Sequence, residues 1–414
     1  MGVVLDIAER AWQGQLDGTM VQPGAAWGGL ERVADGVSFI LAFANISVVE
    51  TGDGLLLVDA TGPFHAGQAI AELRRATPAP VRAVVVTHGH VDHVFGLGAL
   101  DEDARRAGAP PPEVVAHRAV AARFERYRLT AGWNGRVNQR QFALPAPVFP
   151  TSFRAPDRLV DGDDLVELGG VRAELRHDRG ETDDALWVWL PASRTICAGD
   201  FVIWAAPNCG NPQKVQRYPR EWAAALRRMA ALDAEVLLPG HGPPVLGAAR
   251  VRTLLDDTAA FLEELVEKTL ALMNAGATLD EIVHAVHVDD RWLTRPYLRP
   301  VYDDPEFIVR NVHRLYGGWW DGNPAHLKPP PHAVLARALS DLAGGASALT
   351  RRAEAAAADG DLRLAAELVE LAFAAAPDDP SVRGARAAIY QRRVAEESSL
   401  MARAIFAAAA RESR

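Results

Sequence analysis

Residues 81–98 read V-R-A-V-V-V-T-H-G-H-V-D-H-V-F-G-L-G, and this stretch decides the fold. Its β-branched run, Val84–Val86, predicts a buried strand that ends at Thr87. Four side chains that can bind metal ions follow within six positions: His88, His90, Asp92 and His93. A strand that runs directly into such a cluster predicts a metal site at its end.

The spacing of these four residues favours two metal ions rather than one. His88 and His90, two positions apart on an extended turn, can point into one cavity. Asp92 and His93 begin the following helix and can reach a second point close by. Imidazole and carboxylate groups are common ligands of catalytic metal ions. The alternative is that these are ordinary loop residues near a helix start, which an H-x-H-x-D-H cluster behind a strand disfavours.

The sequence T-H-G-H-V-D-H resembles the H-x-H-x-D-H signature of the metallo-β-lactamase superfamily. The resemblance implies an αββα sandwich and metal-dependent hydrolysis, but the signature alone names no substrate. Residues 37–50, which predict a strand, and a second strand at 55–59 fit the first half of such a sandwich. Asp59, at the end of the second strand, is expected either to support the histidine turn or to cap the next helix.

Two later strands bring polar side chains to the same edge of the sandwich. The strand at 195–200 ends in A-G-D, so that Asp200 could bridge both metal ions. The strand at 235–238 runs into P-G-H-G-P-P and delivers His241. Superfamily members usually carry a further ligand after the second hairpin, in H-x-P-G-H, whereas this chain has H-D-R-G-E and places Glu181 there. Glutamate at this position resembles the alkylsulfatase-like members.

The resemblance implies a ligand set divided between two divalent metal ions. One ion would be held by His88, His90 and Glu181, the other by Asp92, His93 and His241, with Asp200 between them. Asp92 and Asp200 are also expected to take part in catalysis. Zinc suits the imidazoles, and the additional carboxylate leaves manganese or iron as alternatives. His177 is interpreted as a structural or supporting residue rather than a ligand.

The loop before Pro219 departs from the alkylsulfatase pattern. Typical members have a histidine- and arginine-bearing run that binds the sulfate and protonates the leaving oxygen, whereas this chain reads F-V-I-W-A-A-P-N-C-G-N-P-Q-K-V-Q-R-Y-P-R-E-W from residue 201. Four residues of this loop are candidates to bind an anionic substrate: Asn208, Asn211, Lys214 and Arg217. The alternative is that the loop only caps the next helix.

An arginine-rich segment spans residues 118–140. Guanidinium groups suit planar oxyanions, so Arg136 and Arg140 are two further anion-site candidates. The other arginines are expected to solvate a helix face: Arg118, Arg123, Arg126 and Arg128.

The second half of the chain predicts helices. Apolar residues recur at steps of three and four over 254–272, which predicts an amphipathic helix that Gly276 ends. The runs R-P-Y-L-R-P-V-Y and G-G-W-W-D-G-N-P-A-H-L resemble the dimerisation region of the alkylsulfatase-like family, and residues 347–410 resemble tetratricopeptide-type hairpins. We therefore expect a catalytic sandwich over residues 1–246 and an all-α dimerisation domain over residues 247–414. A simple helical cover is the alternative to a dimer surface.

Composition narrows the class of protein further. The 414 residues are 49% hydrophobic, which allows a large core, and their net charge of −9 argues against nucleic acid as a partner. Two cysteines, no signal-like amino terminus and no membrane-length apolar run lead us to expect a cytoplasmic protein without membrane contact.

The favoured hypothesis is a homodimeric, dinuclear-zinc, alkylsulfatase-like hydrolase that acts on a small anionic sulfate ester. Metal ions lower the pKa of water from 15.7 toward ~7, so a hydroxide bridging the pair can attack the ester at neutral pH. The departure in the loop before Pro219 keeps a thioester or lactone hydrolase open as an alternative. A metal-free interaction scaffold is a third possibility.

Overall fold

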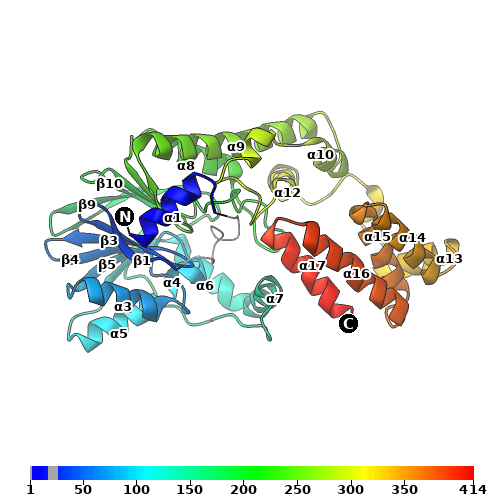
Figure 1. Ribbon diagram of the computed structural model, residues 1–414, viewed down its shortest axis with the longest axis horizontal. Helices are drawn as coiled ribbons and strands as arrows, with labels where there is room; N and C mark the ends of the chain where they lie inside the picture. Colours follow the sequence, from blue (N-terminus) through cyan, green and yellow to red (C-terminus); the bar gives the residue numbers. More distant parts are fainter. Residues whose placement is uncertain (1, 17–26) are drawn as a thin grey trace. The chain divides into compact units, whose positions relative to one another are not determined.

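The computed structural model describes residues 2–16 and 27–414 (Figure 1). The chain divides into two compact units. The first unit comprises residues 1–131, 150–277 and 281–318, and the second comprises residues 132–149, 278–280 and 319–414.

Two mixed β-sheets form the first unit. The seven strands of the first sheet lie in chain order: β1 (Gly29–Ala34), β2 (Val37–Leu41), β3 (Ile46–Thr51), β4 (Gly54–Val58), β5 (Val81–Val85), β6 (Glu113–His117) and β7 (Arg158–Val160). The six strands of the second sheet lie in the reverse order: β13 (Val245–Leu246), β12 (Val236–Pro239), β11 (Thr195–Gly199), β10 (Leu186–Leu190), β9 (Val171–His177) and β8 (Asp164–Leu168). Strands β4 to β7 are parallel, and β11 and β12 are parallel. The carboxyl ends of parallel neighbours therefore meet at one edge.

Helices accompany the two sheets. In chain order these helices are α1 (Val3–Trp12), α3 (Ala66–Ala76), α4 (Val91–Val94), α5 (Leu97–Arg106), α6 (Ala119–Leu129), α8 (Pro219–Ala230), α9 (Ala248–Asn274), α10 (Leu279–Ala285), α11 (Asp290–Leu293) and α12 (Pro305–Gly317). Of these, α12 packs on α9 rather than on a sheet. One core joins the facing sides of the sheets, for example Val85 with Leu175, and a second core lies on the other side of the first sheet, for example Val84 with Leu97. The alternation of valines in β5 thus supplies both cores, and the predicted αββα sandwich is confirmed.

Residues 37–50 form two strands rather than the single predicted one. The chain reverses between β2 and β3, which pair antiparallel. Asn45 fixes this reversal, because its Oδ1 accepts a hydrogen bond from the backbone N of Ala42 at 3.1 Å. An asparagine, which favours turns, within a largely apolar run is the feature of the sequence that marks the reversal.

The second unit is helical apart from its connecting segments. Its helices are α7 (Ala131–Phe142), η1 (Pro324–His326), α13 (His332–Leu342), α14 (Ala346–Ala358), α15 (Leu362–Ala375), α16 (Pro380–Glu396) and α17 (Leu400–Glu412). Helices α14 to α17 pack on one another in succession, as expected for hairpin repeats. Asp361 and Asp379 cap α15 and α16 at the two predicted turns. In the described part of the chain, we find no helix with both the length and the apolarity that a bilayer crossing requires.

The predicted amphipathic helix is confirmed as α9, whose C-terminal turn is followed by Gly276 at φ +84°. This helix packs against α8 and contacts β12 and β13. The first compact unit consequently continues beyond residue 246, where the sequence predicts a domain boundary. The boundary at 246/247 stays a prediction.

The loop between β11 and α8 is anchored by a buried carboxyl group. Asp303 is inaccessible to solvent and accepts hydrogen bonds from the backbone N of Gly210 at 2.5 Å and of Asp304 at 2.8 Å. Burial raises the pKa of Asp303 to about 7, against an ordinary 3.8. Keeping the carboxyl group of Asp303 buried therefore costs folding free energy once it ionises, and this cost depends on pH.

We expect Asp303→Asn to raise the free energy of unfolding at pH 8 by up to ~4 kcal/mol. Between pH 4 and pH 7 the unfolded chain has lost this proton while the folded chain keeps it, so wild-type stability falls as pH rises. An amide cannot ionise, but it keeps only one of the two acceptor oxygens, so the hydrogen bond lost from Gly210 or Asp304 offsets part of this gain. Urea unfolding at pH 5 and pH 8 measures the effect, with exposed Asp35→Asn as the control. Equal or lower stability of Asp303→Asn at pH 8 would contradict the prediction.

Candidate metal centre

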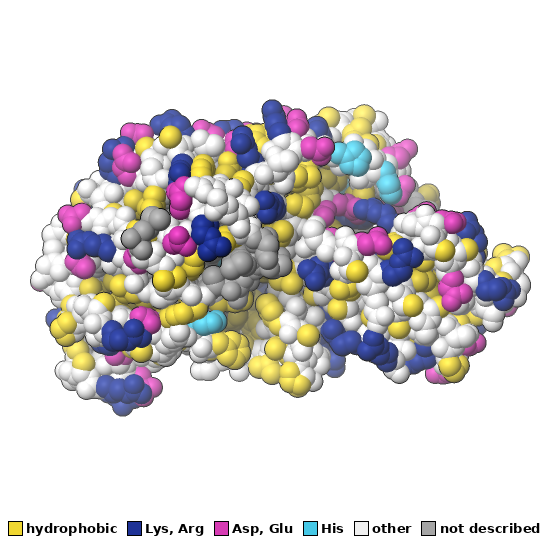
Figure 2. Space-filling model, viewed as in Figure 1, with side chains coloured by type: hydrophobic (Ala, Val, Ile, Leu, Met, Phe, Trp, Pro, Cys, Tyr) yellow, Lys and Arg dark blue, Asp and Glu magenta, His cyan; other side chains and the backbone are white. Residues whose placement is uncertain are grey.

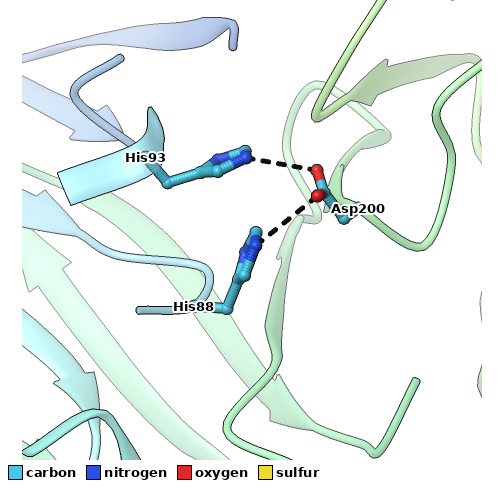
Figure 3. A group of neighbouring side chains, drawn as sticks. All are labelled: His88, His93 and Asp200. Atoms are coloured by element: carbon cyan, nitrogen blue, oxygen red, sulfur yellow. Dashed lines mark ion pairs between the residues drawn. The ribbon is translucent and has the colours of Figure 1, made fainter. Parts of the chain in front are cut away.

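Seven predicted side chains converge at the edge where the parallel strands end: His88, His90, Asp92, His93, Glu181, Asp200 and His241. Asp200 follows β11 and lies at their centre. Its Oδ2 is 3.5 Å from His88 Nε2, and its Oδ1 is 3.3 Å from His93 Nε2 (Figure 3). The same Oδ1 is 3.4 Å from His241 Nε2.

The seven side chains form overlapping groups whose donor atoms lie within 4.8 Å of one another. These groups are His88, His93 and Asp200; Asp92, His93 and His241; and His90, Glu181 and Asp200. We call His88, His90 and Glu181 the first ligand group, and Asp92, His93 and His241 the second ligand group. The second ligand group coincides with one of the three observed groups, whereas the members of the first ligand group are divided between the other two. The role of all seven residues as ligands stays a prediction.

Asp59 supports the histidine turn, as one of the two expectations for it states. Its carboxylate accepts hydrogen bonds from the backbone N and the Oγ1 of Thr87, both at 2.8 Å, and contacts His93 Nδ1 at 2.7 Å. Asp59 and Thr61 both adopt a left-handed backbone, with φ of 65° and 56°. Such strain in residues other than glycine concentrates at functional sites.

The imidazole of His241 is oriented by the turn between β2 and β3. Its Nδ1 donates to the carbonyl O of Phe43, which leaves Nε2 free to face Asp92 at 3.5 Å. Asn45 holds the two loops together, because its Nδ2 donates to the carbonyl O of Pro239 at 3.0 Å and of Gly242 at 2.9 Å. No pattern in the sequence around Asn45 predicts this role.

Unsatisfied buried atoms at the centre fit a divalent cation. His93 Nε2 and Asp200 Oδ1 are buried without a hydrogen bond. Burial lowers the pKa of His93, but Asp200, Asp59 and Asp92 outweigh burial and hold it well above its usual range. Burial also raises the pKa of Glu181, in spite of the neighbouring Arg217. Imidazole nitrogens and carboxylate oxygens aimed at one point are the donors that such ions take.

Two of the predicted substrate-binding residues contact Glu181 instead. Arg217 NH1 lies 2.5 Å from Glu181 Oε1 and also donates to the Glu181 carbonyl O at 2.7 Å. Asn208 Nδ2 donates to the same Oε1 at 2.5 Å. A buried carboxylate is thereby neutralised by a guanidinium group that is itself only 3% exposed. A contact of either residue with substrate stays a prediction.

The other predicted substrate-binding residues differ in their positions. Burial, with a smaller contribution from Arg217, lowers the pKa of Lys214 to about 8, although Glu181 and Asp92 oppose the shift. Asn211 Oδ1 accepts a hydrogen bond from the backbone N of Gln213 and so shapes the loop. Arg136 and Arg140 lie on α7, which belongs to the second unit, and their role as anion ligands stays a prediction.

The structure also shows the surroundings of His177 and Arg123. His177 lies outside the ligand groups found among the described residues and stacks on His117, with ring centroids 3.8 Å apart. Its structural role is therefore supported. Arg123 was expected to solvate a helix face, and this is wrong: Arg123 is only 3% exposed and pairs with Asp184. The i, i+3 and i, i+4 pattern of α6 does not reveal a partner so distant in the sequence.

Comparisons with known proteins agree with this geometry. Residues 41–241 match the family model of the metallo-β-lactamase superfamily, and residues 278–414 match the model named alkyl sulfatase dimerisation. A linear primary-alkylsulfatase of Pseudomonas sp. (strain ATCC 19151) is 29% identical over 371 residues, which cover 83% of this chain and 69% of the relative. An (R)-specific secondary-alkylsulfatase of Pseudomonas sp. is also 29% identical, over 83% of this chain and 55% of the relative.

Two solved structures of alkylsulfatases are also similar to this chain. A double mutant of the sec-alkyl sulfatase PisA1 superposes with a TM-score of 0.86 at 25% identity, covering 97% of this chain and 70% of the other. The stereoselective inverting sec-alkylsulfatase Pisa1 from Pseudomonas sp. gives 0.84 at 26% identity, covering 93% and 66%. Together with the two family models, these matches extend over most of the sequence. This chain therefore belongs to the metallo-β-lactamase superfamily and carries the alkyl sulfatase dimerisation domain in its helical part.

Proposed function

We propose that this protein is a metal-dependent hydrolase of alkyl sulfate esters. The observation that carries the proposal is the convergence of four histidines and three carboxylates at one sandwich edge. The relatives named alkylsulfatases support the substrate class. The chain spans 69% and 55% of the lengths of these two relatives, so the substrate class is part of the proposal.

The first ligand group would hold one divalent ion and the second ligand group the other, with Asp200 reaching both. Two such ions supply an activated water at neutral pH and withdraw charge from the ester. The protein keeps its imidazoles oriented through Asp59 and the Phe43 carbonyl, which fix the Nδ1 side of His93 and His241. Zinc is the proposed metal, with manganese or iron as alternatives.

Positive charge near the site suits an anionic substrate. Lys214 and Arg217 both lie close enough to Glu181 for their charges to interact with its carboxylate. A sulfate monoester presents three oxygens that share one negative charge, and ammonium and guanidinium groups are its natural partners. We propose that Lys214 contacts the sulfate, because its ammonium group is close enough to interact with Glu181 and Asp92, one from each ligand group.

A homodimer is part of the proposal. The dimerisation model covers residues 278–414, and α13 exposes four apolar side chains: Val334, Leu335, Leu339 and Leu342. Figure 2 shows acidic and basic side chains interspersed over much of the face it presents. A cytoplasmic location stays a prediction from the sequence.

A thioester or lactone hydrolase on the same fold is the second candidate. The loop at 201–218 lacks the histidine that alkylsulfatases carry there, and this absence favours a substrate whose leaving group needs no such acid. A metal-free scaffold is the third candidate, and the filled ligand positions argue against it.

We expect the purified protein to release sulfate from a medium-chain alkyl sulfate, and His90→Ala and Asp200→Asn to lower kcat/KM by ~100-fold or more. Each variant removes a donor atom from the centre. Ion chromatography of sulfate measures the rate, with the exposed His287→Ala as matched control. Faster turnover of a thioester or lactone than of any alkyl sulfate would favour the second candidate instead.

Metal removal should abolish hydrolysis. We expect about two divalent ions per chain by elemental analysis, complete loss of activity after dialysis against a chelator, and recovery with Zn²⁺ that exceeds recovery with Mn²⁺ or Fe²⁺. Full activity of a preparation without bound metal would disprove the metal-dependent mechanism. A protein that neither binds metal nor hydrolyses esters would support the scaffold.

A further inference from the structure

A buried ion pair packs against the turn that carries His88 and His90. Arg123, on α6, is 3% exposed, and its partner Asp184 is inaccessible to solvent. Arg123 Nε donates to Asp184 Oδ2 at 2.6 Å and NH2 donates to Oδ1 at 2.9 Å, so both carboxylate oxygens are engaged. Asp183 adds a contact to NH2 at 2.5 Å. Such a fork fixes the orientation of the carboxylate as well as its charge.

Asp184 also holds the turn between two histidines of the first ligand group. Its Oδ2 accepts a hydrogen bond from the backbone N of Gly89, which separates His88 from His90, at 3.2 Å. A Cβ atom at Gly89 would lie 2.9 Å from Arg123 Cδ and 3.2 Å from Asp184 Oδ2. The turn therefore packs against the ion pair without space between them.

The same carboxylate belongs to the loop that carries the third member of this group. Glu181 precedes Asp184 by three positions in the loop between β9 and β10. Asp184 thus ties the turn that follows β5 in one sheet to a loop of the other sheet. All three side chains of the first ligand group lie on the two segments that Asp184 joins.

The second ligand group has its own supports. Asp59 contacts His93, and the Phe43 carbonyl and Asn45 hold the loop of His241. Asp59 reaches both halves of the centre, because it also accepts hydrogen bonds from Thr87, whose Oγ1 lies 3.0 Å from His88 Nδ1. The side chain of Asn45 bonds only to the loops around His241 and the turn between β2 and β3, whereas Asp184 bonds to the turn between His88 and His90. Asn45 and Asp184 therefore each support one half of the metal centre.

We propose that Arg123, through Asp184, is a positioning residue that sets the affinity of the first ligand group for its metal ion. This inference rests on the proposed metal-dependent function and adds which residues control which ion. A buried ion pair that served stability alone would have no such selective effect on metal binding. The two roles make different predictions for metal stoichiometry.

Arg123→Lys keeps the charge and removes the fork, and Asp184→Asn keeps the size of the side chain and removes the charge. We expect each to weaken one of two Zn²⁺ binding events by ~10- to 100-fold and to leave the other unchanged. Calorimetric titration of the metal-free full chain and elemental analysis after dialysis measure both events. Arg118→Lys is the matched control, because Arg118 immediately precedes the same helix and forms an exposed pair with Asp161.

A double variant shows whether Arg123 and Asn45 control different ions. Asn45→Ala, which loosens the loop of His241, should weaken the event that Arg123→Lys leaves intact, so the combination should retain no tight site. If both single variants act on the same ion, the combination keeps one tight site and the inference is overturned. Two unchanged events in a folded Arg123→Lys protein, checked by circular dichroism, would also overturn it.

Asp184→Asn decides the matter if Arg123→Lys does not fold, since an amide retains an acceptor for Gly89. Equal weakening of both events in that variant points to general loosening and rejects a selective role. A wild-type protein that binds no metal would refute the proposed function itself. If the wild type binds two ions and the variants weaken both events equally or neither, only the inference about Arg123 is refuted.

Discussion

Asp200 keeps a negative charge in the protein interior, and the site is built around the need to stabilise it. The residue is 8% exposed. Burial would raise the pKa of Asp200, but the imidazoles of His241, His93 and His88 outweigh burial and hold it well below its usual range. Removing a charge from water costs several kcal/mol unless partners surround it. Loops from both sheets must therefore reach one edge together, and the parallel pairing of β4 with β5 and of β11 with β12 brings them there.

Much of the fold and of the ligand set is predictable from the sequence, because a valine-rich strand followed by H-x-H-x-D-H places four donors within one turn. Asp200 and His241 follow from the ends of later strands, and Glu181 needs the family resemblance. Asn45 and the pair of Arg123 with Asp184 were missed for a common reason. Each acts through hydrogen bonds to segments 61 to 197 positions away, and no local period of the chain encodes such a partner.

The glutamate at position 181 determines what two donors of the loop before Pro219 contact. An imidazole ligand needs no counter-charge, whereas a buried carboxylate does. Arg217 and Asn208 both bind Glu181, so donors that the sequence suggested for substrate are engaged with the protein. Lys214, whose pKa is lowered to about 8 chiefly by burial, is the nearby cation with the clearest opportunity to meet an anion. The loop before Pro219 thus contacts Glu181, a candidate metal ligand, and also carries Lys214, the residue proposed to bind the substrate.

The bonds of Asn45 impose an order on biosynthesis. This side chain joins a turn made early in translation to carbonyl groups of residues 239 and 242. A nascent chain therefore has the H-x-H-x-D-H turn long before it can seat the last imidazole. The seven candidate ligands can therefore meet only after the sandwich has closed on β12, late in the synthesis of the first unit.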